Sequence, residues 1–220
     1  MLKDFAISIV QTLRQRGHQA YLVGGCVRDL VLGREPADYD VTTDATPEQV
    51  MHIFPETYAV GAQFGVVLVP LPAGSDGNAI SKSGHAQANS LDTLAGTDRS
   101  NAGVVEVATF RSDIGYSDGR HPDRVRYSND PRKDVERRDF TINGLLLDPL
   151  SDKILDFVGG QQDLKAGIVR TIGNPDQRFE EDKLRMLRAI RFAARFEYAI
   201  DPGTFGAIQK AAENIHQVSR

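Results

Sequence analysis

Hydrophobic and polar positions alternate along the first half of the chain in the rhythm of helices and short strands. Over residues 2–16 the apolar side chains recur at helical spacing and stop at Gly17, which predicts an amphipathic helix. An apolar run over 20–23 then predicts a short buried strand. The same pattern predicts a helix from about Cys26 to Leu32, a strand over 38–42, a helix beginning at Pro47 with Thr46 as N-cap, a hairpin of strands over 58–60 and 66–69, and a strand over 104–110. This order of elements predicts a mixed α/β (α+β) fold.

Two polar stretches interrupt this rhythm. Residues 71–103 are rich in Gly, Ser, Asn and Ala and contain few large apolar side chains, so we expect a flexible insertion. Residues 111–133 are too charged for a core segment, although they contain Tyr116 and Tyr127. This second stretch is either a plain solvated loop or a mobile lid over a site.

The second half of the chain ends in a helical region. From Asp134 the sequence predicts a helix that runs into a strand, and residues 156–170 predict a strand, a turn and a short helix. From Asn174 onward we predict a helix with its apolar residues near one face, namely Phe179, Leu184, Leu187, Ile190 and Ala194, and with Arg185, Arg188, Arg191 and Arg195 on flanking positions. We therefore expect an α/β part over 1–150 and a hinge with a helical part over 151–220. The last stretch has no obvious helix terminator, so we expect the chain to be the front of a longer protein.

Composition narrows the class of protein. A length of 220 residues with 40% hydrophobic and 25% charged residues is ordinary for a globular protein of one domain, or one domain with an appendage. The net charge of -4 gives no overall attraction to nucleic acid. Arginines nevertheless crowd residues 111–138 and 178–195, so a basic face on an acidic protein is possible.

The cysteine count and the N-terminus bear on localisation. The single Cys26 excludes an internal disulfide and disfavours a cysteine-built zinc site, which fits a reducing, cytoplasmic setting. The N-terminal segment carries Asp4 within a helical pattern, unlike the unbroken apolar centre of a signal peptide. No segment is long and apolar enough to span a bilayer, so we expect no membrane partner.

Two carboxylates separated by one residue, Asp38 and Asp40, are the first candidates for chemistry. In an extended strand their side chains point to the same face and Tyr39 points away. Two carboxylates that share a pocket repel each other unless a cation neutralises them, and hard oxygen ligands suit Mg²⁺. The pattern therefore predicts a magnesium site.

The glycine pair Gly24 and Gly25 lies at the predicted start of a helix. Glycines let the backbone approach a ligand closely, and free N–H groups at a helix start favour phosphate. A DxD or a GG alone is common in plain turns and loops. Their joint order, with the apolar YLV before the glycines and VTT after the second aspartate, favours a site for metal-bound triphosphate.

Four motifs occur in order over nearly the whole chain outside 71–103: GGCVRD with DYD, RRDFTING, DFVGGQQDL and EDKLRMLR. Together they resemble the motifs of the class II tRNA nucleotidyltransferases (CCA-adding enzymes) and of the bacterial poly(A) polymerases that share their head domain. The resemblance implies a nucleotidyltransferase head, with a mixed, mainly antiparallel sheet flanked by helices, followed by a helical neck. It also implies transfer of CMP and AMP from CTP and ATP to a tRNA 3′ end with Mg²⁺.

The resemblance implies that Asp38 and Asp40 hold the catalytic metal ions. One ion would lower the pKa of the RNA 3′-hydroxyl, and the other would stabilise the leaving pyrophosphate. Glu106 is the candidate third carboxylate, because it lies in an apolar strand and the family has an acidic residue at the matching point. The alternative is an edge-strand glutamate that faces water.

The first motif also predicts a phosphate ligand. Arg28 follows the glycines closely, so its guanidinium is expected to reach a triphosphate oxygen beside the backbone donors of Gly24 and Gly25. Asp29 is expected to orient Arg28 or to cap the helix.

In the second motif Arg138, Asp139 and Asn143 resemble the residues that hold the ribose and sense its 2′-hydroxyl. The spacing from Asp139 to Asn143 is one helical turn, so both side chains can face one ligand. The neighbouring Arg137 could equally be a surface charge.

The fourth motif predicts base selection. Asp182 and Arg185 are three residues apart in a predicted helix, so an acceptor and a fork of donors lie side by side. Cytosine and adenine each offer an exocyclic amine beside an unprotonated ring nitrogen, whereas uracil and guanine offer a carbonyl beside a ring N–H. The pair fits the first two bases and opposes the others. The alternative is a surface ion pair. Glu181 and Arg188 are expected to brace the pair.

The third motif is expected to shape the turn from sheet to helices and to act as a hinge rather than as a ligand site. The residues concerned are Asp156, Gly159, Gly160 and Asp163.

Several alternatives remain at this point. Poly(A) addition uses the same head, but the sequence AVGAQFGVVLV over 59–69 favours the CCA-adding pattern. Partial enzymes that add only C or only A share the head too. A nucleotide-binding or RNA-binding module without catalysis predicts a broken carboxylate pair, and a dinucleotide-binding domain predicts a GxGxxG; neither occurs. Because relatives hold the tRNA body beyond the neck, we expect this chain to bind nucleotide but to extend tRNA feebly.

Overall fold

The computed structural model describes residues 1–59, 64–72, 103–117 and 119–217. The expected flexible insertion over 71–103 therefore lies outside the described residues except at its ends. Within the described residues, no helix is long and apolar enough to cross a membrane.

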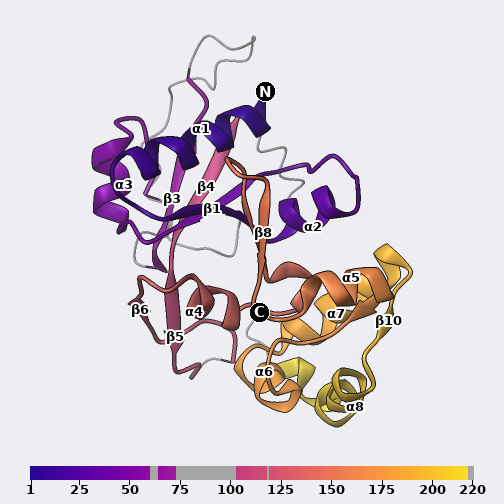
Figure 1. The fold of residues 1–220 in the computed structure, drawn as a ribbon. Coiled ribbons are helices and arrows are strands. Elements are labelled where there is room, and N and C mark those ends of the chain that lie inside the picture. The colour runs from indigo at the N-terminus through magenta and orange to yellow at the C-terminus, as the bar shows by residue number, and fades with distance from the viewer. Residues whose placement is uncertain (60–63, 73–102, 118, 218–220) are drawn as a thin grey trace.

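A six-stranded sheet forms the centre of the protein (Figure 1), with the strand order β3-β4-β2-β1-β7-β8. Among its neighbouring pairs, β2 and β4 run parallel and the others run antiparallel. The predicted mixed, mainly antiparallel sheet is thus confirmed. The strands are β1 (Ala20–Val23), β2 (Asp40–Thr43), β3 (Val66–Pro70), β4 (Val104–Thr109), β7 (Leu145–Asp148) and β8 (Lys153–Asp156). Because β8 belongs to the sheet, the sheet continues past residue 150.

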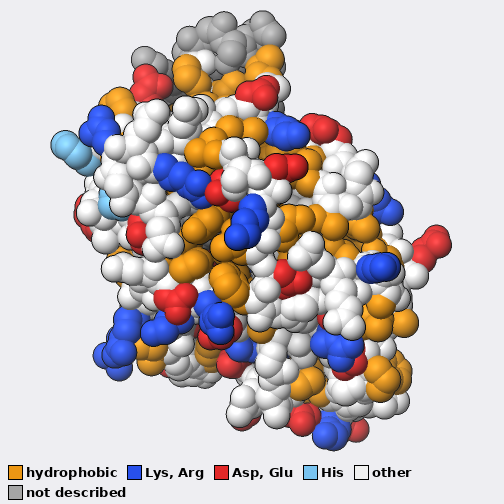
Figure 2. Space-filling view, viewed as in Figure 1, with side chains coloured by type: hydrophobic (Ala, Val, Ile, Leu, Met, Phe, Trp, Pro, Cys, Tyr) orange, Lys and Arg blue, Asp and Glu red, His pale blue; other side chains and the backbone are white. Residues whose placement is uncertain are grey.

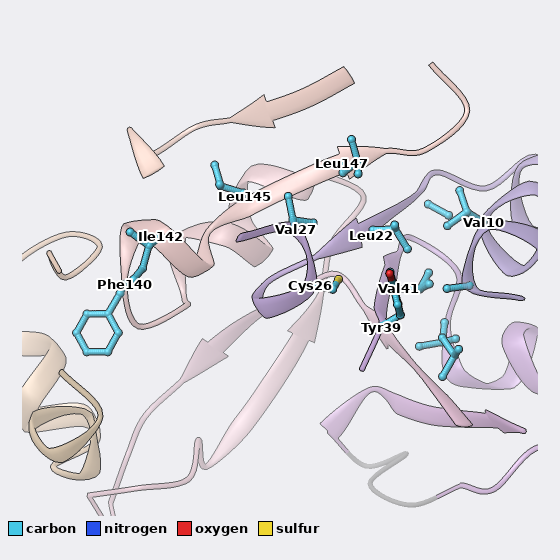
Figure 3. Packing of buried hydrophobic residues seen from close by; sticks show 14 of the residues in the cluster. Val10, Leu22, Cys26, Val27, Tyr39, Val41, Phe140, Ile142, Leu145 and Leu147 are labelled. Atoms are coloured by element: carbon cyan, nitrogen blue, oxygen red, sulfur yellow. The ribbon is translucent and has the colours of Figure 1, made fainter. Parts of the chain in front are cut away.

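Helices α1 (Leu2–Gln15) and α3 (Pro47–Ile53) cover one face of this sheet (Figure 1). Val10 of α1 packs with Leu22 of β1 and Val41 of β2 in the main hydrophobic core (Figure 3). The predicted start of α3 is confirmed, since the Thr46 side chain accepts from the backbone of the third helical residue and a proline occupies the first helical position.

The opposite face of the sheet carries the polar side chains of β2. Because side chains alternate along a strand, Asp40 and Thr42 point away from the core that holds Val41. Helix α4 (Pro131–Glu136) lies on this second face. The Thr42 hydroxyl donates to a carboxylate oxygen of Asp134 on α4, at 3.2 Å. The second face is therefore polar at β2, whereas Val23 and Leu146 on the same face pack with Val135 of α4 in a smaller hydrophobic cluster.

The C-terminal region is helical, and Figure 1 shows its helices gathered at one end of the molecule, beyond α2 (Gly25–Val31). A two-stranded parallel sheet ties this region together. The remaining elements are η3 (Thr141–Asn143), α5 (Gly160–Ala166), β9 (Ile168–Val169), α6 (Pro175–Glu181), α7 (Leu184–Phe196), β10 (Ala199–Ile200), α8 (Pro202–Ala211) and η4 (Ala212–Gln217).

Several predicted strand boundaries need correction. The strand predicted over 38–42 begins only at Asp40, and Asp38 lies in an exposed bend before it. The predicted hairpin near 58–69 is reduced to one antiparallel bridge between Tyr58 and Leu68, and residue 60 lies outside the described residues.

The stretch 111–133, predicted as a polar loop, contains regular structure. Strands β5 (Arg111–Ile114) and β6 (Arg124–Tyr127) form a two-stranded antiparallel sheet in this stretch. Part of the charge is paired within the stretch, since the Arg111 guanidinium bonds to Asp113 at 3.0 Å, and Arg111 also donates to the Phe64 carbonyl. Paired charges take the place that apolar side chains have in an ordinary strand.

The apolar face predicted from residue 174 onward is right for Phe179, which is buried, but wrong within α7. The helix is interrupted at Asp182, whose backbone is extended, so α6 and α7 are separate helices. Leu187 and Ile190, predicted to lie on the buried side, are 51% and 49% exposed. Helix α7 instead buries Arg185, Met186, Ala189, Phe192 and Phe196. Four of these five residues are apolar, so the inward face follows a different apolar stripe from the predicted one, with Arg185 buried beside it.

Candidate active site

Asp40 and Glu106 lie side by side at the edge of the polar face. They are partners in the parallel pairing of β2 with β4, so their side chains leave the sheet on the same face. Both are partly buried. Glu106 is thus on an inner strand beside Asp40, and the alternative of an edge-strand glutamate is excluded.

Asp38 does not join these two carboxylates in a compact cluster. Over the described parts of the chain, no group of three or more His, Cys, Asp or Glu side chains is placed to hold a metal ion. The donor set nevertheless fits a hard divalent cation, since Asp40 and Glu106 offer only carboxylate oxygens. The role predicted for Asp38 in metal binding stays a prediction.

The Gly24 turn follows directly on β1 and lies beside Asp40. In the antiparallel pairing Leu22 faces Val41, which brings Val23 and then Gly24 next to the start of β2. Gly24 has φ 79° and ψ -131°, a conformation that suits only glycine. A Cβ atom on Gly24 would lie 3.3 Å from Nη1 of Arg138. The structure thus brings the first and second motifs together at this turn.

Asp134 is a buried residue of this region that the sequence analysis did not select. Its carboxylate accepts hydrogen bonds from Arg137 at 2.8 Å and from Arg138 at 3.0 Å. Burial alone would raise the pKa of Asp134, but the two guanidinium groups lower it to about 2. The available signal was its position, three and four residues before two arginines in a predicted helix.

Arg137 is not a surface charge. Its side chain is 18% exposed and forms an ion pair with Asp134, and Nη1 lies 3.7 Å from Asp113. The open alternative for Arg137 is therefore excluded, and this residue holds α4 against the β5–β6 sheet.

A chain of hydrogen bonds runs from the first motif through the second. Arg28 donates to Asp29 at 2.8 Å and, through Nη1, to the Asn143 side-chain oxygen at 2.7 Å. The Asn143 amide donates in turn to Asp139 at 3.1 Å. Asp139 and Asn143 are bonded to each other, and Asp139 precedes the short η3 helix rather than lying in a helix with Asn143. The expectation that both face one ligand stays a prediction.

The same chain reaches the fourth motif. Arg188 donates through Nε to the second carboxylate oxygen of Asp139 at 2.8 Å. Burial acts to raise the pKa of Asp139, but Arg188 and the hydrogen bond from Asn143 lower it below its usual value. Arg188 therefore contacts Asp139 instead of bracing the base-selection pair by a direct bond.

Arg28 is more enclosed than predicted. It is 5% exposed, and its guanidinium lies 4.7 Å from the Phe196 ring centroid. The predicted contact with Asp29 is present. Its predicted contact with a triphosphate stays a prediction, since the structure already engages this group with protein partners.

Asp182 and Arg185 lie at the break between α6 and α7. Arg185 donates to Glu181 at 2.7 Å, which is the predicted bracing contact, and its Nε lies 4.0 Å from Asp182. Burial raises the pKa of Asp182 above its usual value. The Asp182 side chain also accepts from the Leu184 backbone at 2.9 Å, so its position is fixed by the helix start.

The β5–β6 sheet contacts this same junction. The Arg185 guanidinium lies 5.9 Å from the Tyr116 ring centroid, and the Lys183 backbone N–H donates to the Gly119 carbonyl at 3.3 Å. The Tyr116 hydroxyl donates to Asp113 at 2.9 Å. The segment proposed as a lid therefore touches the candidate base-selection residues, and its mobility stays a prediction.

The third motif shapes a turn, as predicted. Asp156 accepts four backbone N–H bonds, from Val158, Gly159, Gly160 and Gln161. A Cβ atom on Gly160 would collide with the Thr141 carbonyl, so glycine allows α5 to approach η3 closely. Its role as a hinge stays a prediction.

With this geometry in place, the chain belongs to the family of the Poly A polymerase head domain, whose family model matches residues 20–75 and 78–170. The CCA-adding enzyme of Ligilactobacillus salivarius (strain UCC118) is 36% identical over 214 residues, covering 97% of this chain and 46% of that protein. The CCA-adding enzyme of Geobacillus stearothermophilus is 38% identical over 214 residues, with the same coverage. The chain thus spans about half the length of the curated relatives it matches.

A solved structure agrees with this assignment. The crystal structure of the Bacillus stearothermophilus CCA-adding enzyme in complex with CTP matches with a TM-score of 0.75 and 36% sequence identity. The match covers 97% of this chain and 44% of that one. The fold expected from the four motifs is therefore confirmed.

Proposed function

We propose that this chain is the nucleotide-transferring part of an enzyme that adds CMP and AMP from CTP and ATP to a tRNA 3′ end. The observation that carries the proposal is the placement of Asp40 and Glu106 on one face of β2 and β4, directly beside the Gly24 turn. A carboxylate pair beside a glycine turn can hold a metal-bound triphosphate. The relatives named CCA-adding enzyme favour tRNA as the acceptor.

In this proposal Asp40 holds a divalent ion together with Asp38, and Glu106 is the third catalytic carboxylate. The family generally uses a divalent metal, and we propose Mg²⁺ because the donors are carboxylate oxygens. Bound there, the metal would supply charge stabilisation for the attacking 3′-hydroxyl and the leaving pyrophosphate. The Gly24 and Gly25 backbone and Arg28 bind the phosphates in this scheme.

The ribose and base are read by the second and fourth motifs in this proposal. Arg138, Asp139 and Asn143 hold the ribose. Asp182 accepts from the exocyclic amine of cytosine or adenine, and Arg185 donates to the neighbouring ring nitrogen. The contact between Arg185 and Glu181 supports this assignment, because a fixed guanidinium presents its donors in one direction. Arg188 acts in this scheme by positioning Asp139, to which it donates a hydrogen bond.

A basic surface supports an RNA partner. Figure 2 shows Lys and Arg side chains gathered on the side where Figure 1 places α4, β5 and β6. The exposed basic residues of β6 and α4 are Arg124, Arg126, Arg132 and Lys133. Positive side chains of this kind bind the phosphates of RNA. We propose the cytoplasm as the site of action. We also propose a division into a head and a hinge with helical neck, with the boundary after β8 rather than at residue 150.

The second candidate is poly(A) addition, because the matching family model describes a Poly A polymerase head domain. Enzymes that add only C or only A are further forms of the same activity. All of them share the carboxylates, so the acceptor and the order of addition distinguish them.

Primer extension tests the proposal. Purified chain receives tRNA that ends before C, after C or after CC, with each triphosphate offered singly in the presence of Mg²⁺. We expect ordered but feeble addition of C, C and A, abolished in Asp38→Ala and Asp40→Ala. Runs of A on any RNA would instead support poly(A) addition. Absence of both extension and CTP binding would overturn the proposal.

A further inference from the structure

Asp134 on α4 is a fully buried carboxylate that the mechanism above does not use. Its exposed fraction is 0%. Burying a charge is costly unless hydrogen bonds and counter-charges offset the loss of water. A charge kept in such a place needs an explanation, and the contacts of its two oxygens give one.

The two carboxylate oxygens of Asp134 have different partners. Oδ1 accepts from Nε of Arg137 at 2.8 Å, and Nη2 of Arg137 lies 2.7 Å from it in an ion pair. Oδ2 accepts from Nη2 of Arg138 at 3.0 Å and from the Thr42 hydroxyl at 3.2 Å. Thr42 lies two residues after Asp40 on the same face of β2. Asp134 therefore fixes Arg138 relative to the strand that carries the catalytic aspartate.

Arg137 and Arg138 differ in the guanidinium N–H donors that do not contact Asp134. Arg137 uses Nε and Nη2 on Asp134, and its Nη1 lies 3.7 Å from Asp113. Arg138 uses Nη2 on Asp134, while its Nε is buried and has no hydrogen-bond partner among the described residues. Nη1 of Arg138 lies against the Gly24 turn, 3.3 Å from the place of a Cβ atom. Arg138 thus keeps donors at the turn that Arg137 does not have.

We propose that Asp134 is a positioning residue that holds the Arg138 guanidinium over the Gly24 turn, so that Arg138 binds the phosphates of the nucleoside triphosphate as well as the ribose. The inference rests on the proposed function, since it needs a triphosphate at this turn. A buried donor without a partner costs free energy that an anionic ligand can offset. A guanidinium held by one nitrogen on a carboxylate can still present its other donors to phosphate. Asp134 acts only through Arg138.

The test compares the affinities of CTP and CMP for the wild-type chain and for Asp134→Asn, by calorimetric titration with Mg²⁺, with CMP measured by displacement of CTP. The expected loss is larger for CTP than for CMP by about tenfold, the weight of one charge-assisted hydrogen bond to phosphate, because the ribose contact of Arg138 is common to both ligands. Asp113→Asn is the matched control, because Asp113 is a buried carboxylate that contacts Arg137 but not Arg138. It should leave the ratio of CTP to CMP affinity unchanged even if it lowers stability.

A second variant, Asp134→Glu, keeps the test decisive if Asp134→Asn misfolds. Asp134→Glu keeps the charge and moves the carboxylate by one methylene group, so both arginines keep a counter-charge. It should give the same selective loss of CTP affinity to a smaller extent, and it decides the question if Asp134→Asn does not fold. Wild-type affinity for CTP in a folded Asp134 variant, or an equal loss for CTP and CMP, would overturn this inference alone. A wild-type chain that binds no CTP would overturn the proposed function and this inference together.

Discussion

The two halves of the candidate site are held in place by different kinds of bond. At the sheet, Asp40 and Glu106 are aligned by the backbone pairing of β2 and β4, so their relative position follows from strand register. At the junction of α6 and α7, Asp182 and Arg185 are placed by side-chain bonds to Leu184 and Glu181. Substitutions at the sheet should therefore change chemistry with little effect on the fold. Substitutions at the junction should change geometry and stability as well.

The largest effect is expected at the sheet. Asp40→Asn keeps the size of the side chain but removes the charge that holds the metal, so turnover in primer extension should fall by about 1,000-fold or more. The free energy of unfolding should change little, because strand pairing is intact. Glu35→Gln, an exposed acid in the preceding loop, is the control and should retain wild-type turnover. Near wild-type turnover of Asp40→Asn would remove the carboxylate pair from the mechanism.

The largest loss of stability is expected in the hydrogen-bond chain that reaches the junction. Asp139→Ala removes the acceptor of Asn143, Arg188 and the Phe140 backbone N–H. Leaving buried donors unpaired should lower the free energy of unfolding by about 3 kcal/mol, measured by urea denaturation.

Asp176→Asn is the matched control for this loss. Asp176 forms an exposed ion pair with Lys210, which should contribute less than about 0.5 kcal/mol. Equal stability of the Asp139→Ala and Asp176→Asn variants would show that the junction does not depend on this chain of bonds.

The contrast between the sheet and the junction of α6 and α7 also explains which parts of the site could be predicted from sequence. The Gly24 turn and the strand that carries Glu106 follow from local periodicity, because each is fixed by neighbours along one strand or turn. The start of β2 does not, since the pattern places it at Asp38 and the structure places it at Asp40.

Asp134 and the buried face of α7 could not be predicted from local periodicity either. Their burial depends on contacts with other segments, such as the Thr42 hydroxyl for Asp134 and the Tyr116 ring for Arg185. Arginines such as Arg185 resemble surface residues until those contacts are known.

The β5–β6 sheet was missed for a related reason. Asp113 bonds Arg111 within its own strand and also Tyr116, so a polar sequence reaches order without an apolar stripe. The pattern of hydrophobic positions does not reveal stabilisation that comes from paired charges. Both errors therefore lie where charged side chains are paired or buried.

Base selection should respond to a change at the junction while the sheet stays intact. Asp182→Ala removes the acceptor for the exocyclic amine, so the preference for CTP over UTP should fall by about 10- to 100-fold, the effect of one lost hydrogen bond to a base. Metal-dependent turnover should persist, since Asp40 and Glu106 are unchanged. The control is Glu180→Ala, an exposed neighbour on α6. An unchanged order of preference over all four triphosphates would contradict the assignment of Asp182.

The smallest effect is expected from a change of pH, which separates base selection by Asp182 from its effect on stability. Burial raises the pKa of this carboxyl, so it takes up a proton at a higher pH than an ordinary aspartate. A protonated carboxyl no longer acts as a pure acceptor, and the preference for CTP over UTP in binding should therefore decline several-fold as pH falls towards that raised pKa. In Asp182→Asn the preference should be low at every pH.

Stability should change with the opposite sign. A raised folded-state pKa means that the stabilisation is complete below the unfolded-state pKa of Asp182 and is lost as pH rises through the folded-state value. At neutral pH the ionised Asp182 therefore costs stability, and Asp182→Asn should melt at the same temperature as the wild type or slightly higher. A clear fall in melting temperature at neutral pH would show that the charge of Asp182 stabilises the junction. Its position would then be explained by folding rather than by base selection.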